Sequence, residues 1–250
     1  MKAGLRNVAI LALMALMAWA APPMAALAAP EGFLSEAEDP VLDFLPAPPV
    51  DESPDFARDI NVYWRTRTKR DDDRWLRASA DADIARNWNV IFKDSFGLTL
   101  DKKNTPFTYE LLARASSDVE VSFNEVKDKY KRPRPFVYFN QPFGTTCLPA
   151  EEASIKNNGS YPSGHSAYSW LMAQILSEIS PERLDAIMAR GLDYGFSRVI
   201  CGVHWVSDIE AGRYVASAVN ARLHGNLGFQ ELLAKAKAEI ARLRATPPAE

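Results

Sequence analysis

The chain has 250 residues, of which 29 are lysine or arginine and 32 are aspartate or glutamate, and its formal net charge is −3. A mildly acidic chain has no general electrostatic attraction to nucleic acid or anionic lipid, so any affinity for anions must be local. Two cysteines are too few for a disulfide-built scaffold, whereas the length suffices for one compact domain.

The first 28 residues have the pattern of a secretory signal peptide. Lys2 and Arg6 form a positive start, residues 8–21 are apolar, and small residues at 26–28 allow cleavage after Ala28. The apolar core is too short to span a bilayer comfortably, which disfavours an uncleaved anchor, and no second run is long enough. The sequence therefore predicts a periplasmic protein that has no membrane contact after cleavage.

The mature chain is predicted to be a proline-rich arm followed by helices. Residues 29–52 are rich in proline and acidic side chains, as expected of an extended arm over a folded body. From Ser53 onward no sustained period-2 alternation occurs, which predicts that residues 53–250 form one all-α domain with a bundle core. We expect helices at residues 54–66, 82–92, 163–179, 181–199, 204–223 and 229–243, and a long helix that starts at Thr105-Pro106 and is ended by Pro133 and Pro135.

Two of these helices carry apolar stripes at spacings of three and four, which predict buried faces. The stripe in the long helix consists of Leu112, Ala115, Val119, Phe123, Val126 and Tyr130. The stripe in residues 181–199 consists of Leu184, Ile187, Met188, Leu192 and Val199. In contrast, residues 69–77 are predicted to be a solvated face, and residues 93–104 and 140–159 are predicted to be loops.

The stretch GSYPSGH, residues 159–165, precedes one predicted helix. Ser163 is a good N-cap, Gly164 allows another group to approach the backbone, and His165 follows at once. A helix N-terminus binds anions readily because its amide N–H groups are unpaired. Taken alone, the stretch fits an ordinary helix cap with an incidental histidine equally well.

Two further segments supply complementary chemistry. Lys127 and Arg134 flank the end of the long helix, and Arg198 precedes a histidine, His204, that lies four residues before Asp208. Two arginines and a lysine can enclose a tetrahedral dianion, because guanidinium groups match pairs of phosphate oxygens. The spacing of four predicts that the histidine and the carboxylate share one helix face, which would leave one imidazole nitrogen free to attack.

Together these segments form the pattern K-x6-R-P, P-S-G-H and S-R-x5-H-x3-D, which resembles that of the phosphatidic acid phosphatase type 2 superfamily. That superfamily also contains the vanadium-dependent haloperoxidases. The longer match GSYPSGH, the leader and the chain length are similar to the class A bacterial non-specific acid phosphatases. The resemblance covers residues 107–243, and Ser166 departs from the threonine that is usual there.

The resemblance implies a cofactor-free, metal-independent acid phosphatase with a phosphohistidine intermediate. His204 would attack phosphorus, Asp208 would orient it, and His165 would protonate the leaving group and then activate water. The implied phosphate ligands are Lys127, Arg134, Ser163, the Gly164 N–H and Arg198. Nucleotides and sugar and aryl phosphates would be substrates, alcohols would be potential acceptors, and the chain would form homo-oligomers.

Other classes fit less well. A metal hydrolase would need a denser cluster than three histidines provide, and a serine hydrolase would need a G-x-S-x-G elbow. A vanadium haloperoxidase would share nearly all site residues but is typically much larger, and a lipid-phosphate phosphatase would need membrane spans. A non-catalytic periplasmic phosphate-binding protein would have no need for a His–Asp pair.

The two cysteines, Cys147 and Cys201, lie near these motifs. They can form one disulfide in an oxidising compartment, or they can be two buried thiols. A disulfide would tie the loop before PSGH to the segment that carries His204.

Overall fold

The computed structural model of the chain describes residues 30–35, 44–68, 72–83, 87–142 and 144–245. Every regular element within these ranges is a helix, which confirms the predicted all-α class. None of these helices has the length and apolar composition needed to cross a membrane. The predicted signal peptide lies outside the described residues.

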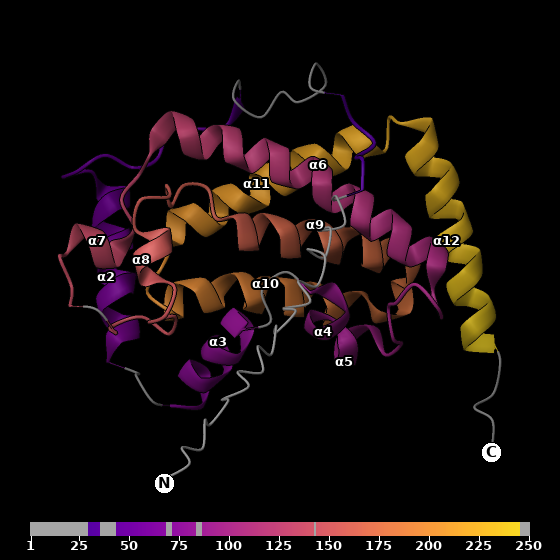
Figure 1. Cartoon of the computed structure of the whole chain (residues 1–250), viewed down its shortest axis with the longest axis horizontal. Coiled ribbons are helices and arrows are strands. Elements are labelled where there is room, and N and C mark those ends of the chain that lie inside the picture. The colour runs from indigo at the N-terminus through magenta and orange to yellow at the C-terminus, as the bar shows by residue number, and fades with distance from the viewer. Residues whose placement is uncertain (1–29, 36–43, 69–71, 84–86, 143, 246–250) are drawn as a thin grey trace, which may run out of the picture.

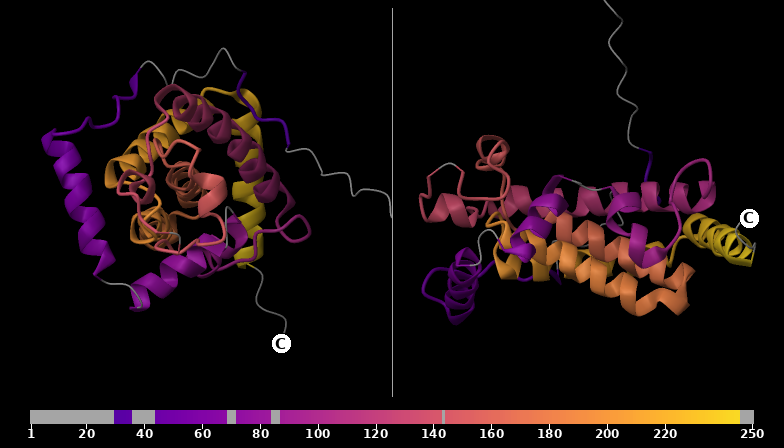
Figure 2. Two further views of the ribbon diagram at one scale, coloured as in Figure 1. Left: turned by 60° about the vertical axis from the view of Figure 1, so that its left-hand side comes forward. Right: turned by 90° about the horizontal axis from the view of Figure 1, so that it is seen from below.

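The fold is built around α9 (Gly164–Ile179), which is largely apolar and is buried over most of its surface. It runs through the centre of a bundle, as Figure 1 and the left view of Figure 2 show. The helices packed against it are α6 (Pro106–Tyr130), α10 (Leu184–Ile200) and α11 (Val206–Leu223). Ser163 caps α9, since its Oγ accepts from the Ser166 N–H at 3.4 Å. The N-terminus of α9 therefore lies inside the protein.

The long helix α6 matches its prediction closely. It begins at Pro106, and its predicted stripe is buried, apart from the half-buried Tyr130. The Thr105 side chain does not cap the helix. Glu239 of α12 (Leu227–Ala245) caps it instead, because its carboxylate accepts from the Thr108 N–H at 3.0 Å. The helix ends at Tyr130, and its C-cap residue Lys131 has a left-handed φ of 45°. The chain then turns into residues 132–135, the R-P-R-P segment.

The prediction that the whole apolar stripe of α10 is buried is wrong in part. Leu184 and Leu192 are 48% and 44% exposed, whereas the buried face carries Gly191, Tyr194 and Arg198. The reason is the close approach of α9: a Cβ at Gly191 would lie 2.8 Å from the Ala173 Cβ. A buried face made of small and polar residues cannot be recognised from apolar spacing.

The region between α2 and α6 also differs from the prediction. After α2 (Pro54–Arg67), α3 (Asp73–Asp83) begins inside the segment predicted to be solvated and buries Trp75 near α10. The expected helix at 82–92 and loop at 93–104 are replaced by two short helices, α4 (Trp88–Ile91) and α5 (Lys93–Phe96). Charged residues on the exposed face of α3 obscured its short buried face.

The described parts of the N-terminal arm are anchored to the bundle. Phe33 and Leu45 are buried, and the amides of Phe33 and Leu34 donate to the Asp118 carboxylate of α6 at 3.0 Å. Further along, the Pro46 carbonyl accepts from the Tyr161 hydroxyl at 2.6 Å. The arm thus contributes apolar side chains to the core as well as backbone contacts.

The segment 140–159, predicted to be a loop, follows α7 (Pro135–Tyr138) and contains the short helix α8 (Glu152–Ile155). Buried Glu152 organises it by accepting from the Thr146 N–H at 3.0 Å and from the Thr146 hydroxyl at 2.6 Å. A disulfide joins Cys147 to Cys201 at the end of α10. The helices α2, α7 and α8 all lie at the end of the bundle where α9 begins (Figure 1).

Candidate active site

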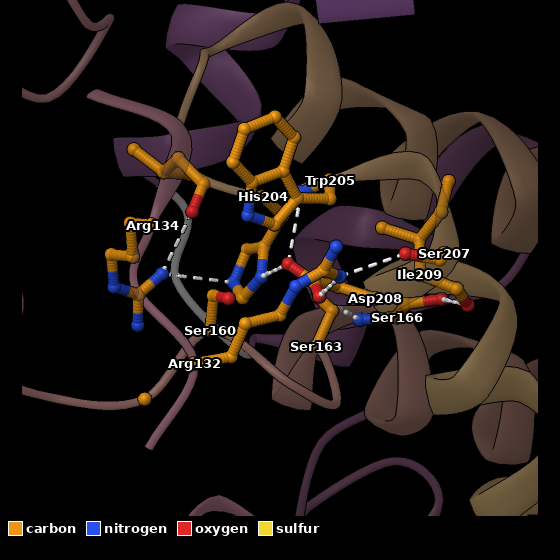
Figure 3. A network of polar contacts seen from close by, with 12 residues as sticks. Arg132, Arg134, Ser160, Ser163, Ser166, His204, Trp205, Ser207, Asp208 and Ile209 are labelled. Atoms are coloured by element: carbon orange, nitrogen blue, oxygen red, sulfur yellow. Dashed lines mark hydrogen bonds and ion pairs between the residues drawn. The ribbon is translucent and has the colours of Figure 1, made fainter. Parts of the chain in front are cut away.

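The three motif-bearing segments meet at the N-terminus of α9. The Ser163 N–H donates to the Asp208 carbonyl at 2.9 Å, and the Ser166 hydroxyl donates to the Ile209 carbonyl at 2.7 Å (Figure 3). This approach requires glycine at position 212 of α11, where a Cβ would lie 2.6 Å from the Ser163 carbonyl. The PSGH turn is also tied to the R-P-R-P segment, because the Ser160 N–H donates to the Arg132 carbonyl at 2.9 Å.

His204 and Asp208 are in contact, but not on one helix face as predicted. His204 lies in the turn before α11, and Asp208 is the third residue of that helix. The Asp208 Oδ2 accepts from the Trp205 N–H at 2.9 Å and lies 3.3 Å from His204 Nδ1. The carboxylate therefore caps the helix and faces the imidazole at once, so a helix start brings the pair together.

The second nitrogen of His204 faces a cation. Arg134 Nη1 lies 3.1 Å from His204 Nε2, and a guanidinium can only donate, so this contact favours the tautomer in which Nε2 accepts. Nδ1 then carries the proton and points to Asp208. Burial lowers the pKa of His204 well below its ordinary value, and Arg134, Lys127 and Arg198 lower it further. In the tautomer with the proton on Nδ1, the lone pair of the neutral imidazole is directed toward Arg134.

Three buried cations surround this lone pair. Lys127 Nζ donates to the Gly159 carbonyl at 2.6 Å, and burial, reinforced by Arg134, lowers its pKa to about 7. Arg134 is held by the carbonyls of Ile155 and Val203 at 3.0 Å each, and burial, with a contribution from Arg198, lowers its pKa to about 10.

Arg198 has guanidinium N–H groups that can still donate hydrogen bonds to a ligand. Its side chain is buried, and its Nε and Nη1 make no hydrogen bond within the described part of the chain. Burial lowers its pKa as well. Buried guanidinium nitrogens are costly to leave unpaired, and a tetrahedral anion would satisfy them while offsetting the three positive charges.

The predicted residues of the α9 cap lie at the same end of the bundle. Ser163 is buried, and its hydroxyl, which accepts one bond, can still donate another. Gly164 is packed under the Phe123 ring, which would lie 2.9 Å from an added Cβ. His165 is partly buried, and its ring stacks on Tyr194 with 6.1 Å between the centroids.

Sequence reasoning missed two buried charged residues of this site. Arg132 donates to Asp208 Oδ1 at 2.6 Å and to Asp59 Oδ2 at 2.8 Å. Arg132 could have been noticed in the R-P-R-P segment, whereas nothing in the sequence around Asp59 sets it apart from other acidic residues of α2.

Two cavities flank residues 154–159, and Lys127 lines one of them. One of about 660 Å³ is polar and is lined by Lys127, Lys131, Ser154 and Asn158, among others. The other, of about 300 Å³, is lined by Phe136, Val137, Glu152 and their neighbours. No group of three or more histidine, cysteine or carboxylate side chains in the described ranges could hold a metal ion.

The fold and site define an α-helical protein with a buried, cation-rich anion site and a His–Asp pair. The PAP2 superfamily profile matches residues 110–225, which include all the predicted site residues. A non-specific acid phosphatase of Providencia stuartii is 41% identical over 81% of this chain and 82% of its own. One from Salmonella typhimurium is 40% identical over 79% and 78%, and an acid phosphatase of Zymomonas mobilis is 35% identical over 82% and 77%. The chain belongs to the PAP2 superfamily and, within it, to the class A bacterial acid phosphatases.

Proposed function

We propose that this protein is a broad-specificity acid phosphatase that hydrolyses phosphate monoesters through a phosphohistidine. The observation that carries the proposal is the buried imidazole of His204, whose Nε2 lies 3.1 Å from Arg134 among three buried cations that lower its pKa. An imidazole lone pair beside a cationic cage is suited to attack phosphorus. The relatives named as non-specific acid phosphatases support the same reaction class.

In the first half-reaction, His204 Nε2 forms a bond to phosphorus as the ester P–O bond breaks. Lys127, Arg134 and Arg198 would bind the phosphoryl oxygens, together with the Ser163 hydroxyl and the Gly164 N–H. The proton on Nδ1 stays with the imidazole, whose developing positive charge is stabilised by Asp208. His165 donates a proton to the departing oxygen, so that an alcohol leaves.

In the second half-reaction, His165 takes a proton from water as the water oxygen attacks phosphorus. The N–P bond breaks, inorganic phosphate leaves, and His204 recovers its lone pair. An alcohol in place of water would give transfer of the phosphoryl group instead. No step requires a metal ion, because lysine and arginine supply the positive charge.

Acid conditions suit this arrangement for two reasons. Lys127, with a pKa of about 7, is charged below that pH and neutral above it. The lowered pKa of His204 keeps the nucleophile neutral in mild acid, where an ordinary imidazole is protonated. A charged cage and an unprotonated nucleophile therefore coexist on the acid side of neutrality.

The cage recognises the phosphoryl group, which favours a wide range of monoesters such as nucleotides and sugar and aryl phosphates. The predicted leader and the Cys147–Cys201 disulfide both fit the periplasm, where disulfides persist. We further propose that the mature protein acts as a homo-oligomer on small molecules, without a nucleic-acid or membrane partner.

The test is hydrolysis of p-nitrophenyl phosphate against pH, with EDTA and with vanadate, for the wild type and His204→Ala. We expect an acid optimum, no loss with EDTA, inhibition by vanadate and an inactive variant. Loss of activity with EDTA that zinc or magnesium restores would refute the metal-free mechanism. Phosphate binding without turnover would indicate a binding protein, and halide oxidation by peroxide in the presence of vanadate would indicate a haloperoxidase.

A further inference from the structure

Arg132 lies between two buried carboxylates that come from distant parts of the chain. Arg132 is 6% exposed, Asp59 of α2 is 1% exposed, and Asp208 of α11 is fully buried. The guanidinium is shared between them, because Nη2 lies 2.8 Å from Asp59 and Nη1 lies 2.6 Å from Asp208. Figure 3 shows Arg132 beside Asp208. Charge-assisted bonds of this length are among the stronger hydrogen bonds in proteins.

Asp59 also holds the start of α11. Its Oδ1 accepts from the Ser207 N–H at 2.9 Å, and its Oδ2 accepts from the Ser207 hydroxyl. That hydroxyl in turn accepts from Arg132 Nη1 at 2.7 Å. The guanidinium carbon lies 5.3 Å from the centroid of the Trp205 ring, so an aromatic surface further limits its orientation. Asp59 thereby fixes both Arg132 and the first turn of the helix that carries Asp208.

The bonds to Asp208 are divided between its two oxygens. Oδ1 accepts from Arg132, and Oδ2 accepts from the Trp205 N–H and faces His204 Nδ1. Because Arg132 holds Oδ1 of Asp208, the other oxygen, Oδ2, is directed at the His204 imidazole. Burial raises the pKa of Asp208 above its ordinary value, and Arg132 provides the largest influence that opposes this rise.

We propose that Asp59 and Arg132 are a positioning pair that keeps Asp208 ionised and aimed at His204 during phosphoryl transfer. The proposal rests on the proposed roles of His204 and Asp208, and neither member of the pair touches the reacting atoms. Asp59 lies outside the residues matched by the superfamily profile, so the proposal extends the site to α2.

A competing explanation is that the pair only docks α2 onto the bundle, and the pH dependence of activity separates the two. The titratable and charged groups that face Asp208 come from several segments. They are Lys127 of α6, Arg132 and Arg134 of the R-P-R-P segment, Tyr161 before α9, and His204, and Asp59 of α2 is linked to Asp208 through Arg132. Among the described residues, Arg132 is the cation that donates directly to its carboxylate.

The experiment compares Arg132→Gln, Arg132→Lys and Asp59→Asn with the wild type, using kcat per active site, the phosphate inhibition constant and the pH profile. Arg132→Gln removes the cation, so kcat should fall about 10- to 100-fold. The acid limb of kcat/KM should move to higher pH by about one unit or more. Arg132→Lys and Asp59→Asn disturb the positioning of Asp208 but keep a positive charge at residue 132. We therefore expect kcat to fall while the acid limb of kcat/KM does not move to higher pH. Phosphate inhibition should stay near the wild-type value in all three.

Two controls make the result decisive. Arg244→Gln removes a guanidinium that bonds Ser180 and the Phe96 carbonyl far from the site, and it should lower stability without moving the pH profile. The double variant Asp59→Asn/Arg132→Gln should lose no more kcat than Arg132→Gln, because the pair acts as one unit. Should Arg132→Gln not fold, Arg132→Lys and Asp59→Asn still carry the test.

The positioning role is overturned if the variants resemble Arg244→Gln, with wild-type kcat per site and an unmoved acid limb, or if the two losses multiply in the double variant. His204→Ala separates this failure from failure of the proposed function. Turnover by His204→Ala would refute the phosphohistidine mechanism itself, whatever the Arg132 variants do.

Discussion

Two histidines bracket α11, and their surroundings differ in every respect that matters for reactivity. His204, before the first turn, is 2% exposed and is surrounded by cations that lower its pKa. His224, at the C-cap, has a side chain that is 38% exposed, and it contacts the Asn220 carbonyl and Glu178 at 2.8 Å each. The comparison shows that burial and neighbouring charge make a histidine into a candidate nucleophile.

The largest effect should come from replacing His204 with alanine, and the same replacement of His224 is the matched control. His204→Ala removes the attacking nitrogen, so hydrolysis should fall by at least about 10⁴-fold, as for other catalytic groups that act as a unit. His224→Ala should leave kcat/KM near the wild-type value, because it removes only a helix-end contact. The measurement is steady-state hydrolysis of p-nitrophenyl phosphate. A large loss of activity in His224→Ala would show that burial and neighbouring charge do not separate the roles of the two histidines.

The next effect concerns His165, the predicted proton donor. Alkyl phosphates need protonation of the leaving oxygen, so His165→Ala should slow them by about 10²–10⁴-fold. Nitrophenolate leaves without help, so that substrate should give a burst followed by slow turnover, with acid-labile phosphate trapped on the protein. Equal losses for both substrates and no trapped phosphate would contradict the role assigned to His165.

The Cys147–Cys201 disulfide ties the site end of the bundle together, with a sequence separation of 54 residues. Replacing both cysteines with serine should lower the free energy of unfolding by about 4 kcal/mol in the chain-entropy model. Denaturant unfolding measures the change. If the double variant is as stable as the wild type, the disulfide does not stabilise this end of the fold.

The pH dependence of anion binding should distinguish Lys127 from Lys237. Lys237 lies near His224, and its Nζ is 2.7 Å from a carboxylate oxygen of Glu178. Lys127, with its pKa lowered to about 7, loses its charge above that pH, so anion binding should weaken about 10- to 100-fold between pH 6 and 9. Sulfate is the probe, because its own charge is constant over this range. Lys127→Met should bind weakly throughout and show a much smaller dependence, and Lys237→Met should behave as the wild type.

The smallest effect should come from Glu178, which pairs with His224 and Lys237 on a partly exposed surface. Glu178→Gln should change the unfolding free energy by less than about 1 kcal/mol, since solvent screens such pairs. Hydrolysis should be unchanged. A clear loss of activity would show that the two ends of α11 are coupled.

Much of the fold and site could be predicted from local signals. The helix starts at Ser53-Pro54 and Ser163 follow from N-capping side chains, and the start at Thr105-Pro106 follows from proline at the first helical position. Both signals act within one turn of the chain. The three sequence motifs contain the residues that the fold brings together at the N-terminus of α9. The boundaries of α3, by contrast, were missed, because its buried face is short and its sequence is largely charged.

What the sequence by itself determined about this protein is the all-α class, the main helices and the chemical groups of the site, because helix caps and periodic apolar residues are local properties. Only the tertiary structure decided which face of α10 is buried, since that depends on how closely α9 approaches Gly191. It also decided that a helix-start carboxylate meets His204, and that Asp59 reaches Arg132 across 73 residues of sequence. Contacts between distant segments depend on packing, which no local pattern records.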